Sequence, residues 1–186
     1  MERTTFLVPL RRFDTAKVRL RAQGAADVST LARALASAVI LACTPRTVVV
    51  VCESDDVEEF ARAHGVMAWR SGADNLNAAL QGATEGLEDR YDRFVVVPGD
   101  LRYPEGLSNF EPSSGVTLVA DHRGLGTNLL GLPARSGFRF AFGPDSARRH
   151  RAEAARLGLP VVEVADSPWR FDVDGIEDLH GAPDSM

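Results

Sequence analysis

Cysteine, long apolar runs and excess positive charge are all scarce in this sequence, and each shortage excludes a class of protein. Two cysteines, Cys43 and Cys52, are too few for a disulfide framework, and no cysteine–histidine cluster has the spacing of a zinc site. The net charge of −5 argues against a domain that holds nucleic acid by bulk electrostatics. No apolar run approaches the ~18 residues that span a bilayer, and the first residues do not resemble a signal peptide. We therefore expect a soluble cytoplasmic protein with no membrane or nucleic-acid partner.

Lysine is scarcer still. Of the 21 cationic side chains only Lys17 is a lysine, and the other 20 are arginines. On this fact alone, chance is about as good an explanation as function. The functional interpretation is that a compact, strongly hydrated ammonium group is needed close to phosphate. The alternative is a solvated loop residue.

Strand and helix patterns alternate along the chain, which is 45% apolar and long enough to bury a core. Four successive valines in residues 47–52 are typical of a strand buried on both faces. We expect strands over residues 5–10, 47–52, 66–69, 94–97, 115–120, 128–132, 161–164 and 171–173. We expect helices over residues 28–43, 55–64, 75–87 and 144–157, with Pro144 in the first helical position, and a last turn over 176–179. This order predicts a single α/β domain over residues 1–186 with a mostly parallel sheet and a frayed tail after about residue 180.

Three aspartates are candidates for a metal site. Asp100 follows a predicted buried strand, and ligands of open α/β sheets bind beyond the carboxyl ends of the strands. Asp172 and Asp174 are two residues apart on an extended segment, so their side chains point to the same side. Adjacent like charges are costly unless they are solvated or share a cation, and an all-oxygen set suits Mg²⁺. The alternative is a loop residue at Asp100 and a solvated edge ending in a helix cap at Asp174.

Two glycine-containing segments are suited to binding an anion. In residues 121–128, two glycines expose backbone N–H groups, and Thr127 and Asn128 add side-chain donors. In residues 140–146, Gly143 precedes a helix N-terminus, where unpaired N–H groups favour an anion. Neither segment has the dinucleotide-binding glycine spacing, and no Gly-Lys-Ser/Thr sequence is present. An ordinary turn and an ordinary cap would look the same, and we expect His150, on the helix that follows, to face solvent or the helix end.

These segments occur in the order of a known family. They are residues 8–11, 16–20, 76–80, 99–101, 121–128, 140–146 with 149–150, and 172–174 with 177–179. Over nearly its whole length the sequence resembles the 2-phospho-L-lactate or phosphoenolpyruvate guanylyltransferases of coenzyme F-420 biosynthesis, called CofC or FbiD. The resemblance implies a three-layer α/β/α, Rossmann-like nucleotidyltransferase fold, similar to MobA and the nucleotide-diphospho-sugar transferases. It also implies GTP and a C3 phospho-acid as small-molecule substrates, Mg²⁺ as cofactor and pyrophosphate as product.

The resemblance assigns a role to each candidate residue. The metal would be held by Asp100, Asp172 and Asp174, and the triphosphate by Lys17 with Arg11 and Arg19. The guanine would lie among the loop after the first strand, residues 70–72 and the start of the helix at Asn75, with Asn77 as one of its partners. The acceptor would lie near Thr127, Asn128, Gly143 and Ser146. Three alternatives remain: a nucleotidyltransferase with another base or acceptor such as 3-phosphoglycerate, a non-catalytic nucleotide-binding homologue, and a dehydrogenase-like module. A homodimer is also left open.

Overall fold

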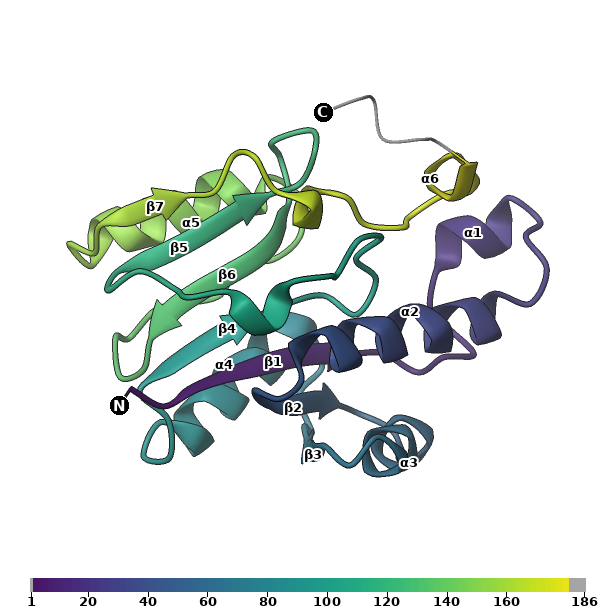
Figure 1. The fold of residues 1–186 in the computed structure, drawn as a ribbon, viewed down its shortest axis with the longest axis horizontal. Coiled ribbons are helices and arrows are strands. Elements are labelled where there is room, and N and C mark those ends of the chain that lie inside the picture. Colours follow the sequence, from purple (N-terminus) through teal and green to yellow (C-terminus); the bar gives the residue numbers. More distant parts are fainter. Residues whose placement is uncertain (1, 181–186) are drawn as a thin grey trace.

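The computed structural model describes residues 2–180, and its centre is a seven-stranded mixed sheet of order β3-β2-β1-β4-β6-β5-β7 (Figure 1). The strands are β1 (Thr4–Leu10), β2 (Thr47–Cys52), β3 (Met67–Arg70), β4 (Arg93–Val96), β5 (Val116–Ala120), β6 (Thr127–Pro133) and β7 (Val161–Glu163). The first four strands pair in parallel, β6 is antiparallel to β4 and β5, and β7 is parallel to β5. The predicted mostly parallel, mixed sheet is therefore confirmed.

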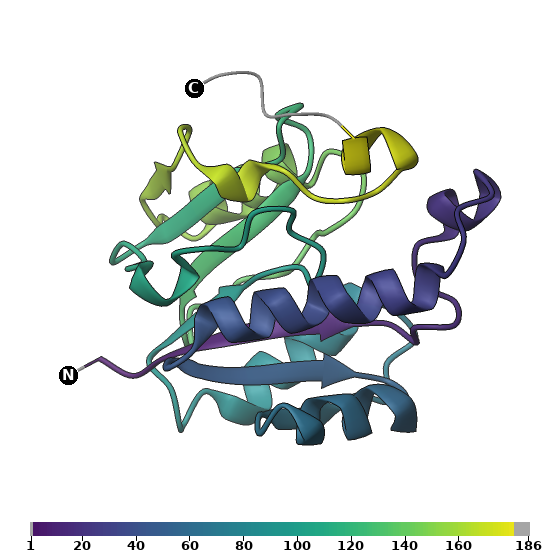
Figure 2. The ribbon, with the colours of Figure 1, turned by 45° about the vertical axis from the view of Figure 1, so that its right-hand side comes forward.

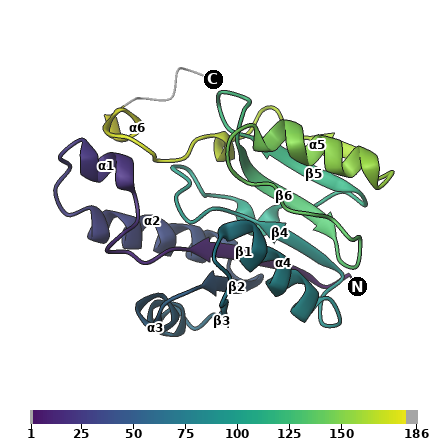
Figure 3. The same ribbon diagram turned by 180° about the vertical axis from the view of Figure 1, so that it is seen from behind.

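Helices cover both faces of this sheet. They are α1 (Val18–Ala22), α2 (Val28–Cys43), α3 (Asp55–Ala63), α4 (Leu76–Leu87), α5 (Ser146–Arg156) and α6 (Ile176–His180), with short 3₁₀ helices at Leu107–Asn109 and Pro168–Arg170. α2 and α3 pack on one face, and α4 and α5 on the other, which is nearer the viewer in Figure 3. The three-layer α/β/α prediction is confirmed. Within residues 2–180, no helix combines the length and the apolarity that crossing a membrane would require.

The run of valines in β2 is explained by burial on both sides. Val48 and Val50 face the core beneath α2 and α3, whereas Val49 and Val51 face the core beneath α4 and α5. Side chains alternate along a strand, so a strand covered on both faces needs apolar residues at every position. The parallel centre of the sheet is fixed in this way by local sequence.

Two expected elements differ in the structure. Residues 171–173 do not join the sheet; Asp172 forms an isolated antiparallel bridge with Leu101 instead. α5 begins at Ser146 and not at Pro144, because Asp145 adopts a left-handed conformation with φ of 55° that interrupts the helix. The frayed tail predicted after about residue 180 lies outside the described residues.

α1 and α6 lie side by side although they come from opposite ends of the chain (Figure 2). The Ile176 N–H donates to the Gln23 carboxamide oxygen at 2.9 Å, and Leu20, Val28 and Val173 form a small buried core between the segments. α1 was not expected from the sequence. This contact carries Lys17, the residue before α1, to the segment that bears Asp172 and Asp174.

Candidate active site

A cavity of about 400 Å³ opens at the carboxyl ends of β1 to β4. Leu10 ends β1, Glu53 follows β2, Ser71 follows β3, and residues 98–100 follow β4; all of them line the cavity. This is the place where open α/β sheets bind ligands. The cavity also reaches residues 73–76 at the start of α4, so it includes the loop after β1, Ser71 and the helix start from the region expected for the base, but not Arg70, Gly72 or Asn77.

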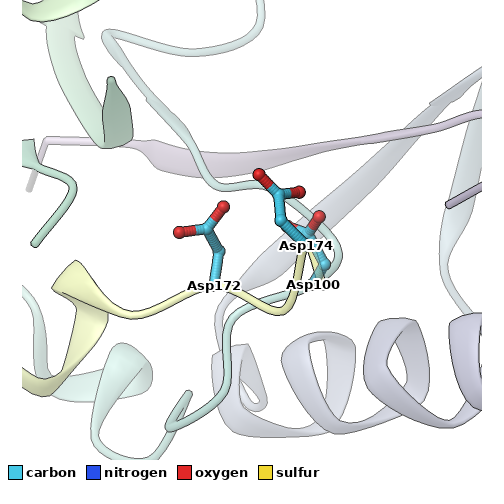
Figure 4. Close-up of side chains that lie close together, drawn as sticks. All are labelled: Asp100, Asp172 and Asp174. Atoms are coloured by element: carbon cyan, nitrogen blue, oxygen red, sulfur yellow. The ribbon is translucent and has the colours of Figure 1, made fainter. Parts of the chain in front are cut away.

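Asp100, Asp172 and Asp174 form an acidic cluster at the edge of this cavity (Figure 4). One carboxylate oxygen from each residue lies within 4.8 Å of the others. Asp100 and Asp172 are half-buried, whereas Asp174 is exposed. The Val173 N–H donates to the Asp100 carbonyl oxygen at 3.0 Å, which fixes the two segments together. The prediction that the three aspartates lie close together is therefore confirmed.

The acidic cluster has more negative charge than its surroundings neutralise. Burial, followed by the charges of Asp100 and Asp174, raises the pKa of Asp172 to about 6, while a hydrogen bond from Asn128 Nδ2 at 3.2 Å acts in the opposite direction. The Oδ1 atom of Asp100 is buried and has no hydrogen-bond partner among the described residues. An unpartnered buried oxygen within an all-carboxylate set is suited to a hard divalent cation such as Mg²⁺. The residues therefore fit a magnesium ion.

Lys17 is part of the same site. Its ammonium group donates to the Asp100 carboxylate, donates to the Val173 carbonyl oxygen at 2.5 Å, and lies 3.9 Å from Asp174 Oδ1. Its side chain is only 10% exposed, so the solvated-loop interpretation is wrong. The backbone of Lys17 has a φ of 58°, a left-handed conformation that L-residues seldom adopt. The fold thus accepts an unfavourable backbone conformation at the position of the single lysine.

Gly99 allows Asp100 to reach Lys17. A Cβ atom built on Gly99 would overlap the side chain of Leu10 at the end of β1. Any residue with a Cβ atom at this position would require the end of the Leu10 side chain to move. The close approach places Asp100 opposite Lys17, which follows β1 in the sequence.

Of the other residues expected to bind the nucleotide, two line the cavity and one does not. Arg11 and Arg19 line the cavity together with Lys17. Asn77 does not: its Nδ2 donates to the Phe142 carbonyl oxygen at 3.0 Å, and its Oδ1 accepts from the Phe142 N–H at 2.7 Å. Both polar atoms of the Asn77 carboxamide are committed to this backbone pair. Asn77 therefore fixes the chain before Gly143 from a position outside the lining of the cavity, and its contact with the base stays a prediction.

The acceptor-side candidates form a second cluster, in which Thr127, Asn128 and Ser146 are buried and Gly143 is exposed. The Ser146 hydroxyl donates to Thr127 Oγ1 at 3.2 Å, and the Ser146 N–H donates to the Gly143 carbonyl oxygen at 3.1 Å. His150 lies 3.0 Å from Thr127 Oγ1 through its Nδ1 and is completely buried. The expectation of a solvent-facing His150 is therefore wrong: α5 turns this residue toward the sheet. Asn128, the residue after Thr127, instead reaches Asp172.

Two polar residues of the cavity were not singled out from the sequence. Glu53 and Asp74 both line it, and each lies in the connection that follows a strand. The rule that identified Asp100 applies equally to Glu53, which comes directly after the valine-rich β2. The signal was present, but surface turns are generally rich in acidic residues.

Comparison with known proteins agrees with this geometry. A family model described as "Guanylyl transferase CofC like" matches residues 4–182. The chain belongs to the CofC-like guanylyl transferase family. It is 32% identical to a phosphoenolpyruvate guanylyltransferase from Sphaerobacter thermophilus, over 95% of this chain and 90% of that protein. It is 31% identical to a 2-phospho-L-lactate guanylyltransferase from Methanothermobacter thermautotrophicus, over 95% and 82%.

Solved structures support the same nucleotidyltransferase-like fold for this CofC-like chain. A crystal structure from Desulfovibrio desulfuricans G20, provisionally described as a nucleotide-diphospho-sugar transferase, matches with a TM-score of 0.76. The match is 20% identical in sequence and covers 96% of this chain and 85% of the other. The predicted fold class and family resemblance are both confirmed.

The acidic cluster should reduce the stability of the metal-free protein. The pKa of Asp172 is raised to about 6, above the unfolded value of about 4, so its charged form destabilises the folded state above pH 6. Asp172→Asn is therefore expected to raise the free energy of unfolding at pH 8 without Mg²⁺ by about 1–2 kcal/mol, and this gain should vanish near pH 4. Thermal melts at both pH values measure it. Added Mg²⁺ should raise the melting temperature of the wild type more than that of the variant; equal shifts would contradict metal binding by Asp172.

Proposed function

We propose that this CofC-like protein transfers GMP from GTP to a small phospho-acid, phosphoenolpyruvate or 2-phospho-L-lactate, and releases pyrophosphate, in coenzyme F-420 biosynthesis. The observation that carries the proposal is the acidic cluster beside Lys17 at the edge of a cavity of about 400 Å³. The acceptors are those named in the relatives. Three converging carboxylates whose mutual repulsion is costly without a cation count against a non-catalytic binding homologue.

The reaction requires positioning and charge neutralisation more than proton transfer. A phosphate oxygen of the acceptor attacks the α-phosphorus of GTP, a new P–O bond forms, and the bond to the pyrophosphate leaving group breaks. Phosphate is already ionised near neutral pH, so no general base is needed. Lys17, with Arg11 and Arg19 at the cavity, neutralises the triphosphate. Asp100, Asp172 and Asp174 would hold Mg²⁺, which would supply additional positive charge to neutralise the phosphates.

The acceptor is proposed to bind beside Thr127, Gly143 and Ser146, which the structure brings together. The Thr127 hydroxyl and the Gly143 N–H are the donors there that suit the anionic oxygens of a phospho-acid. The Asn128 carboxamide also donates to Asp172 and orients that carboxylate. It links the acceptor cluster to the acidic cluster.

The base of GTP is proposed to occupy the part of the cavity between the end of β1 and the start of α4. Guanine presents N1–H and amino hydrogens, which need acceptors, and the O6 atom, which needs a donor. Asp74 offers a carboxylate and Ser71 a hydroxyl on the cavity wall. We expect GTP to outcompete ATP by at least about tenfold in kcat/KM, which is about 1.4 kcal/mol. A competition assay at equal concentrations measures this, and equal use of ATP would contradict a guanine site.

The direct test is incubation of the protein with GTP, Mg²⁺ and one acceptor at a time. Phosphoenolpyruvate, 2-phospho-L-lactate and 3-phosphoglycerate are compared, with pyrophosphate release and the nucleotide product followed by mass spectrometry. We expect a guanosine diphosphate-linked product with one of the first two. Product only with 3-phosphoglycerate would favour the alternative acceptor, and no product with any acceptor would overturn the proposal.

A further inference from the structure

His150 lies in a hydrogen-bond network whose direction is fixed by the backbone. The Ala141 N–H donates to His150 Nε2 at 3.0 Å, so this ring nitrogen must be unprotonated. Burial, with a smaller effect of the Arg149 charge, lowers the pKa of His150 to about 4, which keeps the ring neutral at pH 7. A neutral ring with an unprotonated Nε2 carries its hydrogen on Nδ1.

The Nδ1–H group of His150 determines whether the Thr127 hydroxyl accepts or donates its remaining hydrogen bond. It lies 3.0 Å from Thr127 Oγ1 and donates to it, and the Ser146 hydroxyl donates to the same oxygen at 3.2 Å. A hydroxyl has two acceptor lone pairs and one hydrogen, so both lone pairs of Thr127 are used. Among the hydrogen bonds of residues 2–180, none uses the hydrogen of Thr127 itself. That hydrogen is therefore available as a donor.

We propose that His150 is a positioning residue that makes Thr127 an obligatory hydrogen-bond donor to an anionic oxygen, carboxylate or phosphate, of the acceptor. This inference rests on the proposed function, because Thr127 is assigned to the acceptor there. The His150 imidazole also accepts a hydrogen bond from the Ala141 N–H, and the Asn77 carboxamide pairs with the N–H and the carbonyl oxygen of Phe142. Side chains from α4 and α5 therefore fix the chain before Gly143. His150 thus links the hydroxyl donor and the glycine segment of one binding site.

A double-mutant cycle tests the proposal. His150→Phe keeps a ring of similar size in an aromatic environment formed by Phe138 and Phe142 but removes both nitrogens. We expect His150→Phe and Thr127→Val each to raise the KM for the acceptor at least tenfold, with the KM for GTP unchanged within twofold. The double variant should lose less than the two single losses combined, because the part of the His150 effect that acts through Thr127 is already absent in Thr127→Val. Additive losses, or equal increases in both KM values, would overturn the proposal.

Conservative and control variants exclude a general packing effect. His150→Asn places a carboxamide N–H near the position of Nδ1 and should recover part of the lost acceptor affinity. His64, which contacts Ser37 Oγ at 2.9 Å and the Phe60 carbonyl oxygen at 2.8 Å, offers a half-buried, hydrogen-bonded histidine directly after α3 as a control. His64→Phe should leave both KM values unchanged. No recovery in His150→Asn, or a similar loss of acceptor affinity in His64→Phe, would count against the positioning role.

A spectroscopic measurement separates this proposal from the proposed function. Long-range ¹H–¹⁵N correlation spectra of the wild-type protein at pH 7 identify the tautomer of each histidine ring. We expect the Nδ1–H tautomer for the signal that disappears in His150→Asn. The Nε2–H tautomer or a charged ring would overturn the inference even if guanylyl transfer is observed. The expected tautomer without any transfer to the acceptors would instead indicate that the proposed function is wrong.

Discussion

Asp100→Asn is expected to keep the fold and to lower kcat several hundred-fold, about 3–4 kcal/mol of transition-state stabilisation. The structure gives two reasons for so large an effect. The carboxylate of Asp100 is the partner of the Lys17 ammonium, and its Oδ1 is the buried oxygen that is left for a metal ion. Asparagine keeps the shape but loses the charge that both interactions need. Steady-state turnover with saturating GTP, acceptor and Mg²⁺ measures the loss.

The same strand provides the control for this substitution. Asp92 precedes β4 and pairs with Arg3 on the surface, whereas Asp100 follows β4 at the cavity. Asp92→Asn should therefore leave turnover unchanged. Near-normal turnover in Asp100→Asn, with a melting temperature like that of the wild type, would show that Asp100 neither binds a metal nor positions Lys17.

Exchange of Lys17 is expected to have the second large effect. Lys17→Arg should lower kcat/KM for GTP at least about tenfold, or about 1.4 kcal/mol, and Lys17→Ala about a hundredfold, or about 2.7 kcal/mol. The ammonium group is held by the Asp100 carboxylate and the Val173 carbonyl oxygen in a space that leaves its side chain 10% exposed. A guanidinium is wider and planar, so it cannot present its charge to a phosphate oxygen from the same position.

Kinetics with GTP varied at saturating acceptor decide this prediction. The free energy of unfolding of Lys17→Arg should stay within about 1 kcal/mol of the wild type, since the charge is retained. Arg62→Lys provides a control exchange between the two cationic residues, because Arg62 is an exposed residue of α3 whose side chain is 72% exposed. Wild-type kinetics for Lys17→Arg would mean that any cation suffices and that the single lysine of this chain is a coincidence.

Sequence alone determined the parallel half of the fold and the three aspartates. The two-sided burial of β1 and β2 favours the continuous apolar runs of residues 6–8 and 48–52, so their pattern is local and visible in the chain. Asp172 and Asp174 share a side because extended backbone alternates, and this also depends only on their spacing. Asp100 was found because strand ends carry the ligands in this class of fold. Each of these inferences uses information within a few residues of the site.

Tertiary structure alone decided which polar atoms remain available to a ligand. The contact of Lys17 with Val173 joins residues from opposite ends of the chain and depends on the packing of α1 against the α6 segment. Asn77 looked suited to a base, but the fold places the Phe142 backbone beside it, and the pairing uses both of its polar atoms. His150 looked exposed on a charged helix, yet α5 turns it toward β6, where burial keeps it neutral. Sequence patterns specify which groups a residue carries, whereas long-range packing decides which of those groups are already satisfied within the protein.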